Sequence, residues 1–352
     1  MADLIELSID VSDTVGLGRE LRAAATVHLP DGPLCDPPVV AFMYPGGGYG
    51  RRYFSFDMPD STGGGQAGFH TDRGWIVVTC DHLGAGDSTV IDPDPFGYET
   101  VALGNLAVVR EVMRRLEDGE LGRPPVHDAV KLGFGQSMGG SFLIVLQAHH
   151  TPFDGIAALG SSAIHTVVPS RPGAPAPTWP WYARGADLTT AAPLNLAALT
   201  AAAGASIDGP ESLADTAAAG EHPFTWPFHF DDEPADVVHA DLWAGSDPSI
   251  PVPEWKSLTI PSCAIYMVAP GTVALEAAAI IVPVLSAVGE RDVVPDPWME
   301  PKAFKSSSDV TVYVCPRMAH MHNFAGTRTQ FWQRLHSWGA GVAAGLTGSG
   351  AR

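Results

Sequence analysis

Basic residues and cysteines are both scarce in this sequence. Its 20 Lys and Arg residues face 39 Asp and Glu residues, a formal net charge of −19. Because non-specific nucleic-acid binding depends on positive charge that attracts phosphates, the composition argues against a nucleic-acid partner. The four cysteines are widely spaced and form no CxxC pair, so we expect buried free thiols rather than disulfides or a metal site. They are Cys35, Cys80, Cys263 and Cys315.

The sequence also lacks a long uninterrupted apolar run. Its most apolar region, residues 264–288, is broken by Pro270, Gly271, Glu276 and Pro283, which argues against a membrane-spanning helix. Residues 1–10 mix acidic and apolar side chains and lack the basic start and apolar core of a secretory signal. We therefore predict a cytoplasmic protein without a membrane partner.

Short β-rich runs alternate with helical patterns over the first 160 residues. This alternation predicts the α/β class, with a mostly parallel sheet and helices on both of its faces. Between the fourth and fifth runs, apolar residues from Leu106 to Leu116 recur at spacings of three and four, as on a helix that covers a sheet. The runs are 4–11, 21–29, 39–44, 75–80, 129–134 and 155–159; 280–288 and 310–315 resume the pattern, and 324–346 predicts a final amphipathic helix.

Composition changes between residues 164 and 279, where Pro, Ala and Trp dominate and no period persists. We therefore predict a core formed by residues 1–163 and 280–352, with 164–279 inserted as a cap. The aromatic residues of this insert supply either its own small core or the lining of a pocket over the site, and the sequence leaves both open. They are Trp179, Trp181, Trp226, Trp243, Trp255, Phe224, Phe228 and Phe230.

The strongest chemical signal is the run Gly-Gln-Ser-Met-Gly at residues 135–139, between a predicted strand and a predicted helix. This is the pattern of a nucleophile elbow, in which serine occupies a strained strand-to-helix turn and the neighbouring backbone leaves room only for glycine. Ser137 is therefore the candidate nucleophile. The Met138 N–H, at the start of the helix, is a candidate donor to a developing oxyanion.

With this motif the chain resembles the α/β-hydrolase superfamily, and two further segments fit the resemblance. Pro-Gly-Gly-Gly-Tyr at 45–49 is similar to the superfamily's HGGG-type oxyanion loop, with Pro45 in place of histidine, and implies Gly47 and Gly48 as further oxyanion donors. Residues 81–88 are similar to its D-x-x-G-x-G-x-S turn, a fold marker to which we assign no chemistry.

The same resemblance implies the two partners of the serine. The segment that ends Gly289-Glu290-Arg291-Asp292 resembles the superfamily strand that carries the triad acid, so Asp292 is expected to orient the histidine. His320, preceded by Ala319, fits the loop after the last strand and is the expected base, with His322 as the alternative. We expect His322 to support the site or to face the substrate.

The expected reaction is hydrolysis of a small, mainly hydrophobic carboxylic ester or lactone through an acyl-enzyme, without a cofactor or a metal. The alternatives with the same triad are an O-acyltransferase, a thioesterase and a carbon–carbon bond hydrolase, and a non-catalytic binding module is a different class. Arg51 and Arg52 follow the glycine loop and either bind a substrate carboxylate or, as we prefer, offset nearby acids. The oligomeric state is left open.

Overall fold

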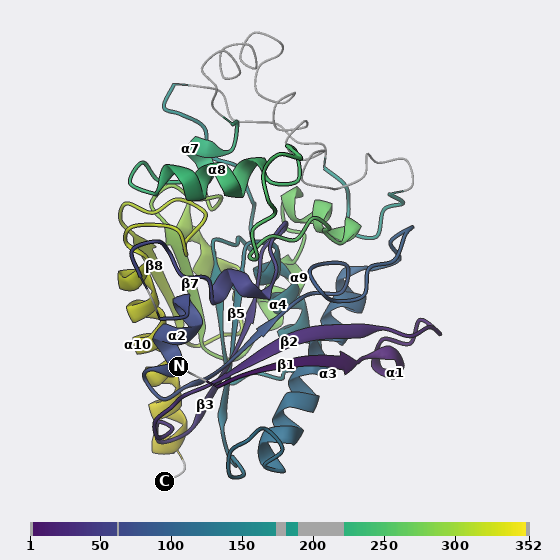
Figure 1. Ribbon diagram of the computed structural model, residues 1–352, viewed down its shortest axis with the longest axis vertical. Coiled ribbons are helices and arrows are strands. Elements are labelled where there is room, and N and C mark those ends of the chain that lie inside the picture. The colour runs from purple at the N-terminus through teal and green to yellow at the C-terminus, as the bar shows by residue number, and fades with distance from the viewer. Residues whose placement is uncertain (1–2, 62, 174–180, 189–221, 350–352) are drawn as a thin grey trace.

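The computed structural model describes residues 3–61, 63–173, 181–188 and 222–349 of the chain (Figure 1). Its centre is an eight-stranded sheet in the order β1-β2-β4-β3-β5-β6-β7-β8. β2 pairs antiparallel with both β1 and β4, and the remaining neighbours are parallel, so the predicted mostly parallel sheet is confirmed. The strands are β1 Asp3–Asp10, β2 Arg22–Leu29, β3 Val39–Tyr44, β4 Ile76–Cys80, β5 Val130–Gln136, β6 Gly155–Leu159, β7 Val284–Gly289 and β8 Val310–Cys315.

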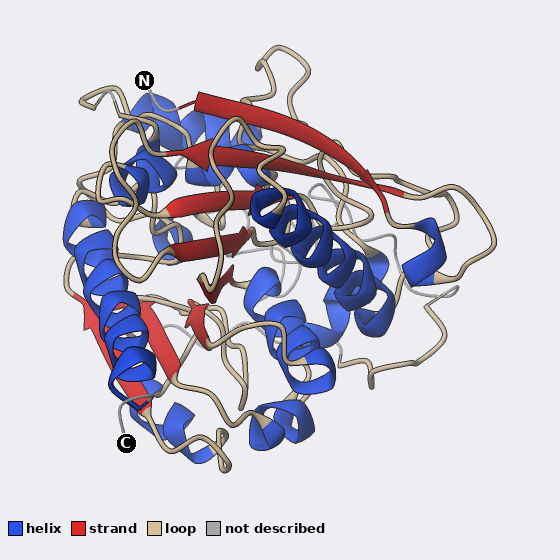
Figure 2. Cartoon of the chain, turned by 90° about the horizontal axis from the view of Figure 1, so that it is seen from below, coloured by secondary structure: helices blue, strands red, loops and turns tan. Residues whose placement is uncertain are grey.

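Helices cover both faces of this sheet, as Figure 2 shows. Alternate residues of β3 point to opposite faces: Val40, Phe42 and Tyr44 pack with α3 (Tyr98–Glu117), α4 (Met138–His150) and α9 (Ala274–Ala279). Val39, Ala41 and Met43 pack with α2 (Gly65–Thr71) and α10 (Arg328–Ser349). The sheet therefore lies between two apolar layers. Short elements complete the set: α1 (Ser12–Val15), α7 (Thr225–Phe228), α8 (Ala235–Trp243) and the 3₁₀ helices η1 (Arg51–Phe54), η2 (Ser262–Val268) and η3 (Pro297–Lys302).

Two predicted boundaries are wrong by four residues. The strand expected over 280–288 begins only at Val284, because Pro283 has no N–H to donate to a neighbouring strand. The final helix, expected from residue 324, begins at Arg328. Before it, Asn323 lies in a turn and bonds Tyr53 through both its backbone and its side-chain nitrogen. These bonds hold the segment that carries His320 against the core.

The segment predicted as a cap is described only in part, because residues 174–180 and 189–221 lie outside the described residues. In Figure 1, α7 and α8 lie above the upper ends of the central strands. Residues 262–279 instead return to the core, where Val273 and Ala277 pack with residues of α4. A separate cap domain over 164–279 stays a prediction.

All four cysteines are free thiols, three of them buried and Cys35 half-buried. Within the described residues, no helix is long and apolar enough to cross a membrane.

Candidate active site

Ser137 lies in the turn between β5 and α4, with φ 51° and ψ −120°. This strained conformation is held by close backbone packing on both sides. A Cβ atom on Gly135 would lie 2.5 Å from the carbonyl oxygen of Gly139, and one on Gly139 would lie 2.4 Å from that of Tyr44. Such contacts are far shorter than any real Cβ contact, so both positions require glycine. The turn therefore has the geometry that the sequence motif predicts.

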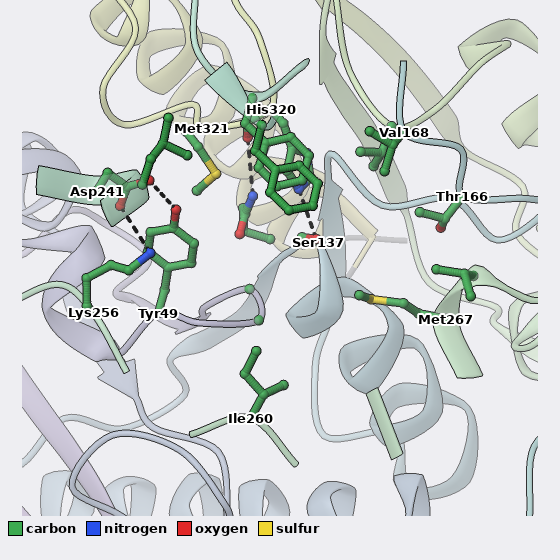
Figure 3. Close-up of a pocket in the computed structure, with 18 of the residues that line it drawn as sticks. Tyr49, Ser137, Thr166, Val168, Asp241, Lys256, Ile260, Met267, His320 and Met321 are labelled. Carbon is green, nitrogen blue, oxygen red and sulfur yellow. Dashed lines mark hydrogen bonds and ion pairs between the residues drawn. The ribbon is translucent and has the colours of Figure 1, made fainter. Parts of the chain in front are cut away.

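Ser137, His320 and Asp292 form one chain of hydrogen bonds, of which Figure 3 shows the bond between Ser137 and His320. The serine Oγ lies 3.0 Å from Nε2 of His320, and the histidine Nδ1 lies 2.6 Å from Oδ1 of Asp292. Because a carboxylate only accepts, Nδ1 carries the proton and Nε2 is free to accept the serine hydroxyl. Burial raises the pKa of Asp292, but the His320 and His322 rings outweigh it and hold that pKa below its ordinary value.

His322 contacts the same acid from its other side. Its Nε2 lies 2.8 Å from Oδ2 of Asp292, and the backbone amides of Gly289 and Val293 also donate to this carboxylate. His320 is thus the histidine that bonds Ser137, while His322 bonds Asp292. The second histidine helps to fix the orientation of the acid and to stabilise its charge.

Of the three glycines at 46–48, only Gly46 and Gly47 line the same cavity as Ser137. Gly46 and Gly47 line a cavity together with Ser137, and a Cβ on Gly47 would lie 3.7 Å from Sδ of Met138. Gly47 therefore lies beside the first residue of α4. Gly48 has a φ of 83°, and its carbonyl accepts a hydrogen bond from Ser257. The tightest position is Gly46, where a Cβ would lie 2.2 Å from Oε1 of Gln136.

We expect Gly46→Ala to lower kcat by about 10²–10³-fold, the cost of losing one oxyanion donor. The added methyl would collide with Gln136 and crowd Cβ of Ser137 at 3.1 Å, which displaces the loop. Gly47→Ala is the comparison variant: it keeps the N–H of residue 47 and its Cβ meets only ordinary contacts at 3.7 Å, so we expect a smaller loss. Steady-state kinetics of both variants test this; equal losses would show that the crowding at Gly46 is not what matters.

His82 contacts the residue that precedes the glycine loop. Its Nε2 lies 3.1 Å from the carbonyl oxygen of Pro45, and its Nδ1 lies 3.1 Å from Nδ2 of Asn105. Nε2 therefore donates to Pro45, and Nδ1 accepts from Asn105. Burial lowers the pKa of His82 to about 4, so the ring is neutral at pH 7.

Replacing His82 by phenylalanine keeps a ring against Tyr44 but removes the hydrogen bond to Pro45. Because the loop would then lose its anchor, we expect kcat to fall roughly 10–100-fold, as for a small displacement of a positioned group, with KM little changed. Measuring kcat and KM together with the melting temperature separates the two roles. A lower melting temperature with unchanged kcat would make His82 purely structural.

Arg51 does not reach toward a substrate. Its guanidinium is bonded to Glu6, Asp81 and Asp87, and the side chain is buried. Asp81 also accepts the backbone amides of Arg51 and Asp87. The D-x-x-G-x-G-x-S turn is thus tied to the residue that follows the glycine loop, the structural role preferred from the sequence. Nη1 of Arg52 lies 3.4 Å from Oδ2 of Asp87, so this arginine also pairs with an acid.

The cavity above Ser137 has a volume of about 110 Å³. Its walls are largely apolar, and Phe224 and Phe228 of the predicted cap are among them. Other members of that aromatic set lie elsewhere: Trp181 is exposed, Trp255 packs with Phe324, and Trp179 lies outside the described residues. Phe224 and Leu242 also form a small apolar cluster with Phe228 and Trp243, so both roles left open for these aromatics occur. Further apolar lining comes from Val168, Leu242, Ile260, Met267 and Val293.

Three features of the site were not anticipated from the sequence. Gly160, directly after β6, leaves room for the acid and base, because a Cβ there would lie 3.0 Å from Oδ1 of Asp292. Gln136 donates from Nε2 to the carbonyl oxygen of His320 and so holds the histidine loop. A buried polar group of Tyr49, Asp241 and Lys256 also lines the cavity. Of these features, only Gly160 could have been found from the local sequence, because it is a glycine directly after a predicted strand.

No cluster of metal-binding side chains is present in the described ranges: no three His, Cys, Asp or Glu residues are grouped as a metal site requires.

No protein-family model matches the sequence, and no curated protein matches it in sequence. Solved structures do match. A proline iminopeptidase from Mycobacterium smegmatis is 16% identical with a TM-score of 0.60, over 97% of this chain and 100% of that one. A thermostable carboxyl esterase from Bacillus coagulans is 16% identical with a TM-score of 0.60, over 97% and 99%. A peroxisomal alpha-beta-hydrolase from Saccharomyces cerevisiae is 13% identical with a TM-score of 0.55, over 98% and 90%. The chain therefore has the α/β-hydrolase fold.

Proposed function

We propose that the protein is a serine hydrolase that cleaves a small, mainly hydrophobic carboxylic ester or lactone through an acyl-enzyme on Ser137. The observation that carries the proposal is the hydrogen-bonded chain from Ser137 through His320 to Asp292, at the wall of an apolar cavity. A hydroxyl, an imidazole and a buried carboxylate in this order are the parts that acyl transfer requires.

The reaction starts when His320 accepts the Ser137 proton at Nε2 as the serine oxygen attacks the substrate carbonyl. Asp292 stabilises the imidazolium that forms. His322 and two backbone amides donate hydrogen bonds to the Asp292 carboxylate and so stabilise its negative charge. The N–H groups of Gly47 and Met138 stabilise the tetrahedral oxyanion. His320 then protonates the leaving alcohol. A water molecule attacks the acyl-enzyme while it gives a proton to the same ring, and the ring returns that proton to the Ser137 oxygen as the acid is released.

The cavity supports an uncharged substrate. Its walls are mainly hydrocarbon, and its volume of about 110 Å³ is below the ~300–1,000 Å³ of pockets for drug-sized ligands, which favours a short acyl group. The net charge of −19 also disfavours anionic substrates. One of the structural neighbours is a carboxyl esterase, which agrees with this substrate class.

A panel of p-nitrophenyl esters of increasing chain length, lactones and acyl-thioesters tests the proposal. We expect hydrolysis of short, uncharged p-nitrophenyl esters with a pre-steady-state burst of p-nitrophenol, since the acyl-enzyme forms before it is hydrolysed. Activity confined to thioesters, or preference for monoesters of dicarboxylic acids, would contradict the proposed substrate class. No turnover of any member by the folded protein would favour a binding module.

A further inference from the structure

One corner of the apolar cavity is polar and buried. Figure 3 shows Lys256, Tyr49 and Asp241 together on one side of Ser137, with Thr166, Val168 and Met267 on the other. Asp241 accepts a hydrogen bond of 2.6 Å from the Tyr49 hydroxyl and one of 2.9 Å from Nε1 of Trp255. Its carboxylate also lies 3.4 Å from Nζ of Lys256.

Backbone pairing fixes the position of Lys256 in the wall of the cavity that Ser137 also lines. Tyr49 and Lys256 form an antiparallel bridge, and the amides of Gly50 and Ser257 donate to the carbonyls of Trp255 and Gly48. The lysine is therefore attached to the end of the same glycine loop that borders Ser137. Its position relative to the reacting carbon is set by backbone pairing rather than by a flexible loop.

Lys256 retains hydrogen-bonding capacity in this corner. An ammonium group has three N–H donors, whereas among the described residues only Asp241 lies within ion-pair distance of Nζ. The remaining neighbour is the Tyr49 ring, whose centroid is 4.3 Å from Nζ. A buried donor without an acceptor costs free energy, so an acceptor brought by a ligand would bind favourably here.

His222 brings a second donor to the cavity wall. Its Nδ1 accepts the backbone amide of Phe224, which places the ring proton on Nε2. This Nε2 is buried and has no hydrogen-bond partner in the described part of the chain. Burial, with a further contribution from the Lys256 ammonium, lowers the pKa of His222 to about 4, so the ring is neutral at pH 7 and donates a single N–H.

The charge of the corner determines which acceptor fits. Asp241 lies between two cations, Lys256 and His229, and His229 is also paired with Glu233, so the charges of the corner are already balanced. The pKa of Asp241 is kept below its ordinary value because Lys256, His229 and Tyr49 outweigh the effect of burial. A ligand carboxylate would add a second negative charge beside Asp241 in a largely apolar cavity, which is unfavourable. A carbonyl oxygen accepts hydrogen bonds without that cost.

We propose that Lys256 and His222 form a second recognition site for an uncharged carbonyl oxygen, so that the substrate is an ester carrying a ketone group apart from the scissile carbonyl. The inference rests on the proposed function and narrows its substrate class. Lys256 and His222 bind the ketone by N–H donation and take no part in bond breaking. The apolar walls accommodate the chain that joins the two carbonyls.

Matched substrates test this. The ketone esters p-nitrophenyl 4-oxopentanoate and p-nitrophenyl 5-oxohexanoate are compared with p-nitrophenyl pentanoate and hexanoate, in which a methylene replaces the ketone. We expect at least one ketone ester to have a kcat/KM roughly 10–100-fold above its methylene partner, the effect of one or two buried hydrogen bonds. Equal values for both pairs in the wild-type enzyme would overturn the proposal.

Variants assign the effect to the two donors. Lys256→Met and His222→Phe keep the approximate side-chain volume but remove the donor, and each should lower the preference for the ketone ester by about tenfold or more. Because Lys256→Met removes one of the two cations beside Asp241 and leaves only His229, the variant Lys256→Met/Asp241→Asn, which restores the charge balance, is made alongside it. Met267→Leu alters the apolar wall alone and should keep the preference.

The outcomes separate this inference from the proposed function. If the wild-type enzyme hydrolyses the pentanoate and hexanoate esters with the same kcat/KM as the ketone esters, the proposed function stands and the second recognition site is rejected. A preference that survives both His222→Phe and the double variant also overturns it. Preference for mono-p-nitrophenyl glutarate over both ketone esters would show that the corner selects a carboxylate. Absence of all ester hydrolysis and of Ser137 acylation would reject the proposed function itself.

Discussion

Replacing Ser137 by alanine is expected to lower turnover by about 10⁶-fold, the loss found when the nucleophile of such a triad is removed. The change deletes the oxygen that lies 3.0 Å from Nε2 of His320 and adds no atom. The cavity walls and the His320–Asp292 pair would remain in place, so we expect a folded protein that still binds substrate. Ester hydrolysis under substrate saturation measures the loss.

Ser141→Ala is the matched control. Ser141 lies one helical turn further along α4 and is buried, so this variant also removes a hydroxyl close to the elbow. Wild-type turnover within about threefold is expected, because a change outside the reacting groups removes no interaction made in the transition state. A Ser137→Ala enzyme that retains more than about one tenth of wild-type turnover would exclude the proposed nucleophile.

Separate alanine variants of His320 and His322 should differ by several orders of magnitude. His320→Ala removes the base and should cost about 10⁶ in turnover, as the serine variant does. His322→Ala removes one hydrogen bond to a carboxylate that keeps His320 and two backbone amides, so we expect a loss of no more than about 100-fold. Turnover and the rate of Ser137 phosphonylation are measured for both.

Two results would contradict this division of roles. Near-complete loss in His322→Ala with an active His320→Ala enzyme would exchange the two histidines. Equal, near-complete losses would mean that Asp292 orients the base only when both rings hold it. His322→Gln is a useful third variant, because its amide can still donate to Oδ2 of Asp292 and should recover part of the activity if positioning is the function of His322.

Those parts of the fold that depend on periodicity and backbone restriction were predictable from the sequence. The strands at 39–44, 155–159 and 310–315 agree with the structure at both ends, because each is a short apolar run beside a turn. Gly135 and Gly139 signalled the elbow, since crowding there allows no side chain. The strand expected from residue 280 begins only at Val284, because Pro283 has no N–H for strand pairing.

Roles that depend on tertiary contacts were not predictable. His82 bonds Pro45, 37 positions away, and Asp241 bonds Tyr49, 192 positions away; no local pattern reports such a pairing. The resemblance implied His320 as the base, but the bond from His322 to the second oxygen of Asp292 has no local signal in the sequence. Lys256 is buried in a largely apolar wall, whereas lysine side chains are usually exposed to solvent.

Covalent labelling tests the central claim most directly. The purified protein is incubated with a p-nitrophenyl alkylphosphonate, and intact mass and peptide mass spectrometry locate the adduct. We predict that one phosphonyl group is attached per chain, on the peptide that contains Ser137, and that one equivalent of p-nitrophenol is released. The adduct should be absent from Ser137→Ala. A folded protein that stays unlabelled, or an adduct on another residue that persists in Ser137→Ala, would contradict the account.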